Sequence, residues 1–249
     1  MDEQLLLDIA TKIGALLLQN GAETYRVEDS VGYVLNAYDL EEFTALAFPG
    51  CIIVSITTRQ QVAMNKSVRV SAPKLNIHRI MQLNSLCRYI STEHPDLIFV
   101  VDQLNEILEI PTYPNHWNQI ANVMAATSFS FFFGGSLTEA SIAGVIGALI
   151  HITSGEMKRF RMNSFSTTII NSFLIAVIAL FFSRLRSDIS YTPIIIGCFM
   201  LLVPGVAITN SARDFIAGDY LSGTIRLSEA LLVATSIALG SGIALSLFR

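Results

Sequence analysis

The chain has 249 residues, of which 52% are hydrophobic and 14% are charged, and its formal net charge at pH 7 is −4. Soluble domains carry about 25% charged residues, so this composition is typical of a membrane protein, and its acidic balance argues against nucleic-acid binding. Residues 1–116 hold 8 Lys and Arg against 14 Asp and Glu, whereas residues 117–249 hold 8 against 6, so we expect the two halves to occupy different solvents.

The first half predicts an α+β domain over residues 1–116. Apolar residues recur at helical spacing over 3–19, and a second helix is expected over about 22–38. Strands are expected at 43–48, 51–58 and 67–73, with a polar loop over 60–66, and further helices at 76–92 and 96–109. The N-terminus lacks the basic and apolar regions of a secretory signal, so the domain is expected in the cytoplasm.

One segment of this domain, GAETYRVED, is dense in functional groups. Glu23, Tyr25, Arg26 and Glu28 lie within two helical turns. Arg26 follows Glu23 by three residues, so an ion pair on one helix face is expected. On spacing alone we favour a surface ion pair of little energetic weight over a functional site.

The second half, residues 117–249, predicts a bundle of about five transmembrane helices, since a crossing needs about 20 apolar residues. The segments cover residues 117–134, 139–152, 167–183, 193–209 and 228–248. Glu139, at the start of the short second segment, fits a capping box with Ser136. The basic residues after that segment favour a cytoplasmic loop; Arg184 and Arg186 then face outward, and five spans leave Arg249 outside.

The fourth segment contains a helix breaker and is followed by charges. Pro204 and Gly205 predict a kink or break, which at membrane depth often lines a substrate site. Arginine can hold a carboxylate, and an acidic side chain can carry a proton. The candidate substrate or gating residues are Pro204, Gly205, Asn210, Arg213, Asp214, Asp219, Arg226 and Glu229. The alternatives are a purely structural kink and a solvated loop whose arginines only set topology.

Two segments together, GAETYRVED and PGVAITNSARDFIAGDYLSGTIRLSEA, resemble the signatures of the threonine/serine exporter family. The order of a cytosolic domain followed by about five spans is also similar, so the resemblance covers nearly the whole chain. It implies a multi-pass protein of the inner (plasma) membrane that exports threonine and serine or dicarboxylates such as succinate. The chain is most similar to the larger component of the family's two-protein form, which implies a second small membrane subunit as partner and leaves a homo-oligomer open.

Two other classes of function remain open at this point. One is a membrane-anchored enzyme or regulator with its active site around Glu23, Tyr25, Arg26 and Glu28, because neighbouring carboxylates can do acid and base work. The other is a scaffold that assembles the partner. Cysteines and histidines are scattered, and phosphate loops and hydrolase motifs are missing, so we expect no enzymatic activity, cofactor or metal.

Overall fold

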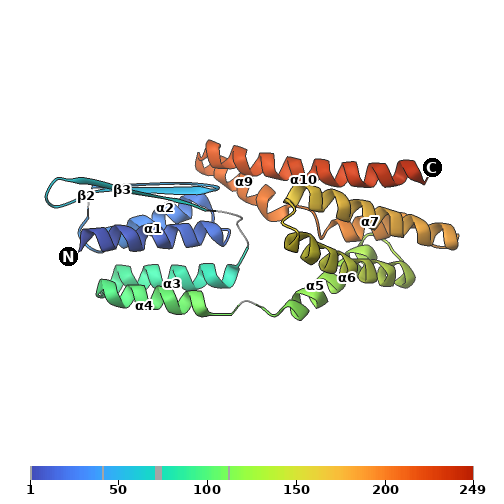
Figure 1. The fold of residues 1–249 in the computed structure, drawn as a ribbon, viewed down its shortest axis with the longest axis horizontal. Helices are drawn as coiled ribbons and strands as arrows, with labels where there is room; N and C mark the ends of the chain where they lie inside the picture. Colours follow the sequence, from blue (N-terminus) through green and yellow to red (C-terminus); the bar gives the residue numbers. More distant parts are fainter. Residues whose placement is uncertain (1, 41, 71–74, 112, 249) are drawn as a thin grey trace. The chain divides into compact units, whose positions relative to one another are not determined.

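The computed structural model describes residues 2–40, 42–70, 75–111 and 113–248. Its elements form two compact units (Figure 1). The first unit joins the chain up to Pro111 with Thr209–Leu227, and the second contains the residues from 112 to 208 together with those from 228 onward. A short segment far along the sequence is therefore part of the N-terminal unit.

The N-terminal unit begins with two helices, α1 (Glu3–Gln19) and α2 (Thr24–Asn36). The Asp2 side chain caps α1 by accepting a hydrogen bond from the Leu5 N–H. Gly21, with φ of 89°, ends α1 in the left-handed region that glycine adopts without strain. The turn of residues 20–23 therefore reverses the chain tightly between the two helices.

Three antiparallel strands in the order β1-β2-β3 pack against these helices: β1 (Phe43–Phe48), β2 (Cys51–Thr57) and β3 (Ala63–Arg69). The prediction of a loop over 60–66 and a strand over 67–73 was wrong, because β3 already begins at Ala63. The backbone turns between Thr58 and Val62. The Thr58 N–H donates a hydrogen bond of 2.9 Å to the Val62 carbonyl. The polar side chains of β3 concealed its alternation, and the last three residues of the predicted strand, 71–73, lie outside the described residues.

Helices α3 (Ile77–Glu93) and α4 (Leu97–Glu109) complete the core of this unit. Its fully buried side chains come from the helices and from the central strand, and include Leu6, Ile13, Val27, Ile52, Leu83 and Leu104. Burial of such side chains supplies the main driving force for folding. The predicted α+β fold of the N-terminal region is confirmed.

The remaining elements are helical: α5 (Asn115–Phe132), α6 (Leu137–Arg159), α7 (Ser164–Leu185), α8 (Tyr191–Phe199), α9 (Gly205–Ala217) and α10 (Tyr220–Leu247). Among the described residues, α6, α7 and α10 are long and apolar enough to cross a membrane. Helix α5 has 18 residues and α8 has 9, and the count of five spans stays a prediction. The helical membrane region itself is confirmed.

The helix boundaries of α6, α8, α9 and α10 can be compared with the expected segments. Helix α6 runs on to Arg159, beyond the expected 139–152, because polar residues continue the helix past its apolar stretch. The segment 193–209 divides into α8 and α9 just before Gly205, as the Pro204–Gly205 pair predicts. Helix α10 already begins at Tyr220, before the expected segment 228–248, so Arg226 lies on a helix and not in the predicted connection, while Glu229 lies on the helix predicted for it. The expected outward position of Arg249 falls outside the described residues.

Small residues and one carboxylate hold the helices of the second unit together. A Cβ atom added to Gly147 of α6 would lie 2.8 Å from the Asn122 backbone oxygen of α5, so α5 and α6 pack backbone to backbone here. Buried Glu139 accepts hydrogen bonds from the Ser136 N–H at 2.6 Å and the Ser190 N–H at 2.6 Å. It completes the predicted capping box of α6 and also ties in the start of α8.

Candidate functional site

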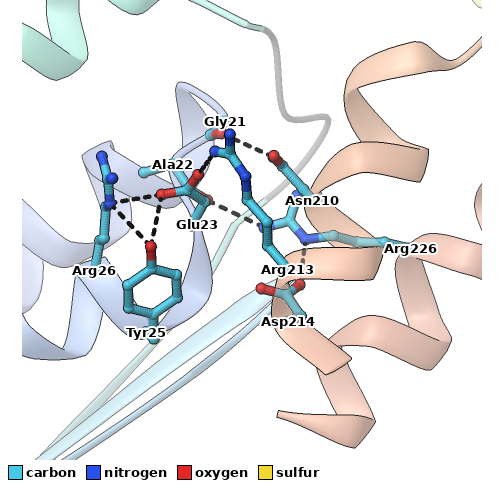
Figure 2. A network of polar contacts seen from close by, with 9 residues as sticks. All are labelled: Gly21, Ala22, Glu23, Tyr25, Arg26, Asn210, Arg213, Asp214 and Arg226. Atoms are coloured by element: carbon cyan, nitrogen blue, oxygen red, sulfur yellow. Dashed lines mark hydrogen bonds and ion pairs between the residues drawn. The ribbon is translucent and has the colours of Figure 1, made fainter. Parts of the chain in front are cut away.

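The candidate site is built on the turn between α1 and α2, where four consecutive residues, 21–24, receive polar contacts from α9 and α10. Figure 2 shows the contacts of Gly21, Ala22 and Glu23. Glu23 is the N-cap residue of α2, yet its side chain makes no capping hydrogen bond to its own helix. The carboxylate is therefore available to side chains from elsewhere in the unit.

Glu23 lies between two arginines. Its Oε2 is 2.6 Å from Arg26 Nε, and its Oε1 pairs with Arg213 Nη1 of α9. The Glu23 side chain is 9% exposed, whereas those of Arg26 and Arg213 are 60% and 54% exposed. Tyr25 Oη completes the group, 3.4 Å from Glu23 Oε2 and 3.2 Å from Arg26 Nε. The expected pair of Glu23 and Arg26 is present, but it is part of a four-residue network around the buried Glu23 carboxylate, which also includes Arg213 and Tyr25.

A second ion pair lies deeper. Asp214 is fully buried, and its Oδ2 accepts a hydrogen bond from Arg226 Nε at 3.0 Å. Arg226 Nη2 also donates to the Ala22 carbonyl at 3.1 Å, and the Arg226 side chain is 12% exposed. Burial raises the pKa of the Asp214 carboxyl, while Arg226 and the Thr24 N–H act against that rise. The pair therefore joins α9, α10 and the turn in one buried contact.

One face of helix α9 contacts the turn of residues 21–24. Asn210, Arg213 and Asp214 are spaced three and four residues apart, so they project from the same side of the helix. Asn210 Nδ2 is 3.5 Å from the Gly21 carbonyl, at the limit of a hydrogen bond. The start of α10 is fixed against α9 by a 2.8 Å hydrogen bond from Ser211 Oγ to the Gly223 carbonyl. One face of α9 thus contacts three residues of the turn, Gly21, Glu23 and Thr24, and Arg226 of α10 contacts the fourth, Ala22.

Two further carboxylates lie beside this cluster. Glu28 Oε1 accepts a hydrogen bond from the Ala47 N–H of β1 at 2.7 Å. Burial raises the pKa of the Glu28 carboxyl, and the charges of Asp219 and Asp29 raise it further, against the Ala47 hydrogen bond. Within the described part of the chain, Asp219 Oδ2 is buried without a hydrogen bond.

The other candidate residues lie apart from the turn. Pro204 is half-buried and Gly205 begins α9. Glu229 is exposed and belongs to the second unit. Over the described ranges no group of three or more His, Cys, Asp or Glu side chains could hold a metal ion.

Both motifs stand out in the sequence, but their residue spacing does not predict the contact between them. Glu23 and Arg213 are 190 positions apart, and helical spacing predicts only contacts within a few residues. Ala22, whose carbonyl accepts from Arg226, carries no functional side chain and gave no signal. The one sequence feature that could have predicted the contact was the complementary charge of the acid-rich motif and the arginine-bearing motif.

Comparisons with known proteins cover the parts of the chain that contain both motifs. Residues 8–248 match the family described as "Putative threonine/serine exporter". A curated relative, the "Probable threonine/serine exporter" of Mycobacterium tuberculosis (strain ATCC 25618 / H37Rv), is 22% identical over 239 residues.

The alignment covers 94% of this chain and 45% of the relative, so the chain spans about half the length of the curated relative it matches. No solved structure matches the chain. The matched family is one of transporters, so the alternative of a membrane-anchored enzyme was wrong. With the family model covering all but the ends of the sequence, the chain belongs to the threonine/serine exporter family.

Proposed function

We propose that this protein is one subunit of a secondary transporter that exports small carboxylate metabolites, with threonine and serine as the first candidates and dicarboxylates such as succinate as the second. The observation that carries the proposal is the family match over residues 8–248. Both substrate classes present a carboxylate, for which arginine is a suitable partner.

A second membrane subunit of the same family is the proposed partner. The support is the resemblance of the chain's two signature segments to the larger component of the family's two-protein form. In transporters built from repeated halves, the substrate site lies where one half faces the other. The partner would supply the facing half, and alternating access would move one half against the other.

In this proposal the N-terminal unit gates the transporter from the cytoplasm. Its turn at residues 21–24 is bound by the face of α9, which begins directly after the break at Pro204–Gly205. A movement of the broken helix would therefore change the contacts of Arg213 and Arg226. The proposed location is the inner (plasma) membrane with the N-terminal unit on the cytoplasmic side.

The test is export of labelled threonine, serine and succinate from cells that express the chain with and without the second subunit. We expect efflux of at least one substrate that needs both chains and falls in R213A. The matched control is R59A, because Arg59 is 62% exposed and pairs with exposed Asp39 away from the turn. Equal efflux in R213A and wild type would remove Arg213 from transport, and no efflux of any substrate with both chains present would favour a regulatory or scaffolding subunit.

A further inference from the structure

The Asp214–Arg226 pair and the group of Glu23 with its two arginines differ in the charge that they leave available to a ligand. Asp214 is fully buried and pairs with Arg226, whose side chain is 12% exposed and also binds the Ala22 carbonyl, so this pair presents little charge to solvent. Arg26 and Arg213 are more than half exposed, and both bind the same carboxylate. A carboxylate carries one negative charge, so this three-residue group has a net charge of about +1.

The exposed arginines also keep unused donors. Arg26 uses Nε for both Glu23 and Tyr25, and Arg213 uses Nη1 for Glu23. For the described residues, the remaining N–H groups of these two guanidinium groups make no other hydrogen bond or ion pair. A guanidinium group has five N–H donors in a planar fork, which suits a second carboxylate.

Glu23 prepares this arrangement. Because its carboxylate is nearly buried and each oxygen meets one arginine, Glu23 holds one guanidinium group on either side of it, from different elements, α2 and α9 (Figure 2). A ligand would then meet arginines whose positions are already fixed, which lowers the entropic cost of binding. The site is complete only while α9 contacts the turn.

We infer that Arg26 and Arg213, held by Glu23, form a binding site for the carboxylate group of a small metabolite at the junction of α2 and α9. This deepens the proposed function, on which it rests, by assigning the carboxylate to these two arginines rather than to Arg226. Binding there strengthens the contact between the turn and α9, because one ligand bridges both elements.

The first test is equilibrium binding of labelled threonine and labelled succinate to the purified full-length chain in detergent. R26Q and R213Q are each expected to weaken binding by about tenfold, the loss that follows removal of a charge-assisted hydrogen bond. R59Q is the matched control and is expected to bind like wild type. Unchanged binding in folded R26Q and R213Q would overturn the inference.

A second test uses the unmodified protein and so does not depend on variants that fold. Phenylglyoxal modifies exposed arginines, and mass spectrometry locates the adducts. Threonine or succinate is expected to protect Arg26 and Arg213 and to leave Arg59 reactive. Equal modification with and without both ligands would overturn the site, and protection by inorganic phosphate alone would overturn the carboxylate assignment in favour of a phosphate such as a lipid headgroup.

These readouts separate the site from the proposed function. Ligand binding that needs Arg26 and Arg213, in a chain that exports nothing with its partner, would leave the site standing and sink the exporter proposal. Export that continues without binding at these arginines would sink the site alone.

Discussion

At the scale of single residues, two charged side chains lie where burial gives them a high desolvation free energy, and an ion pair offsets that cost for each. Glu23 and Asp214 are buried carboxylates, and each is matched to arginine. Removing one partner of a buried pair costs more than removing an exposed pair, because the remaining charge is left without compensation. Loss of these residues therefore has structural as well as functional effects.

We predict that D214N destabilises the protein by about 3 kcal/mol, because the substitution leaves Arg226 charged and nearly buried. Thermal unfolding of the purified protein measures the change. D188N is the matched control: Asp188 pairs with Arg186, and both side chains are more than 60% exposed, so its melting temperature is expected to stay close to that of wild type. Equal melting temperatures for D214N and wild type would show that the buried pair contributes no stability.

Glu28 gives a prediction for pH. Its carboxyl pKa is raised in the folded state, so the folded protein binds this proton more readily than the unfolded chain. The stability from this group is thus present below its ordinary pKa of 4.5 and is lost as pH rises through the folded-state pKa.

The variant E28Q keeps an acceptor for the Ala47 N–H and has no charge to bury. Its melting temperature is expected to exceed that of wild type slightly at neutral pH, and the difference should vanish as pH falls below about 4.5. E93Q, at an exposed position of α3, is the control. A difference that grows on acidification would contradict the raised pKa.

At the scale of elements, the sequence predicted most helices and strands because their apolar spacing is regular. It failed where polar residues interrupt the pattern: β3 carries Asn65, Lys66 and Ser67, and α10 carries Arg226 in its second turn. The contact between the turn and α9 could not be predicted, because hydrophobic periodicity does not report which distant elements meet.

Helix α6 offers a matched pair of glycines. We predict that G147A weakens the packing of α5 on α6 by about 1–3 kcal/mol, since the new methyl would lie 2.8 Å from the Asn122 carbonyl and 2.9 Å from the Ala126 Cβ. G155A has no neighbouring atom within 4 Å, and alanine favours a helix, so it should be neutral or slightly stabilising. Thermal unfolding of both variants tests this, and equal stability would show that the helices can separate without cost.

At the scale of the whole molecule, the composition of the first unit constrains the topology. Residues up to Pro111 and Thr209–Leu227 share one unit and must lie on one side of the membrane. The chain between them therefore crosses an even number of times, which α6 and α7 alone satisfy and which four crossings would also satisfy. The part of α10 from Ser228 to Leu247 is about 30 Å long, enough for one last crossing.

We predict that the loops at the two ends of α7 lie on opposite sides. After replacement of Cys51, Cys87 and Cys198, an impermeant thiol reagent should label S187C in intact cells and F160C only after permeabilisation, with the α6–α7 loop cytoplasmic. Labelling of both positions from the same side would contradict the crossing by α7. Labelling with the two sides reversed would contradict the cytoplasmic assignment of the α6–α7 loop. With a cytoplasmic N-terminal unit it would favour two crossings, by α6 and α7 alone, over four, because only four crossings place that loop on the same side as the first unit.

The contact between Glu23 and Arg213, 190 positions apart, also affects how the protein is made. A ribosome synthesises the N-terminal helices and strands first, and domains generally fold in that order. The ion pair between Glu23 of the turn and Arg213 therefore forms only after the intervening helices have entered the bilayer and α9 has been synthesised. The N-terminal unit is thus completed late in biogenesis. In a chain whose membrane insertion fails, this unit lacks the contacts of α9 and becomes a substrate for the quality-control proteases of the cell.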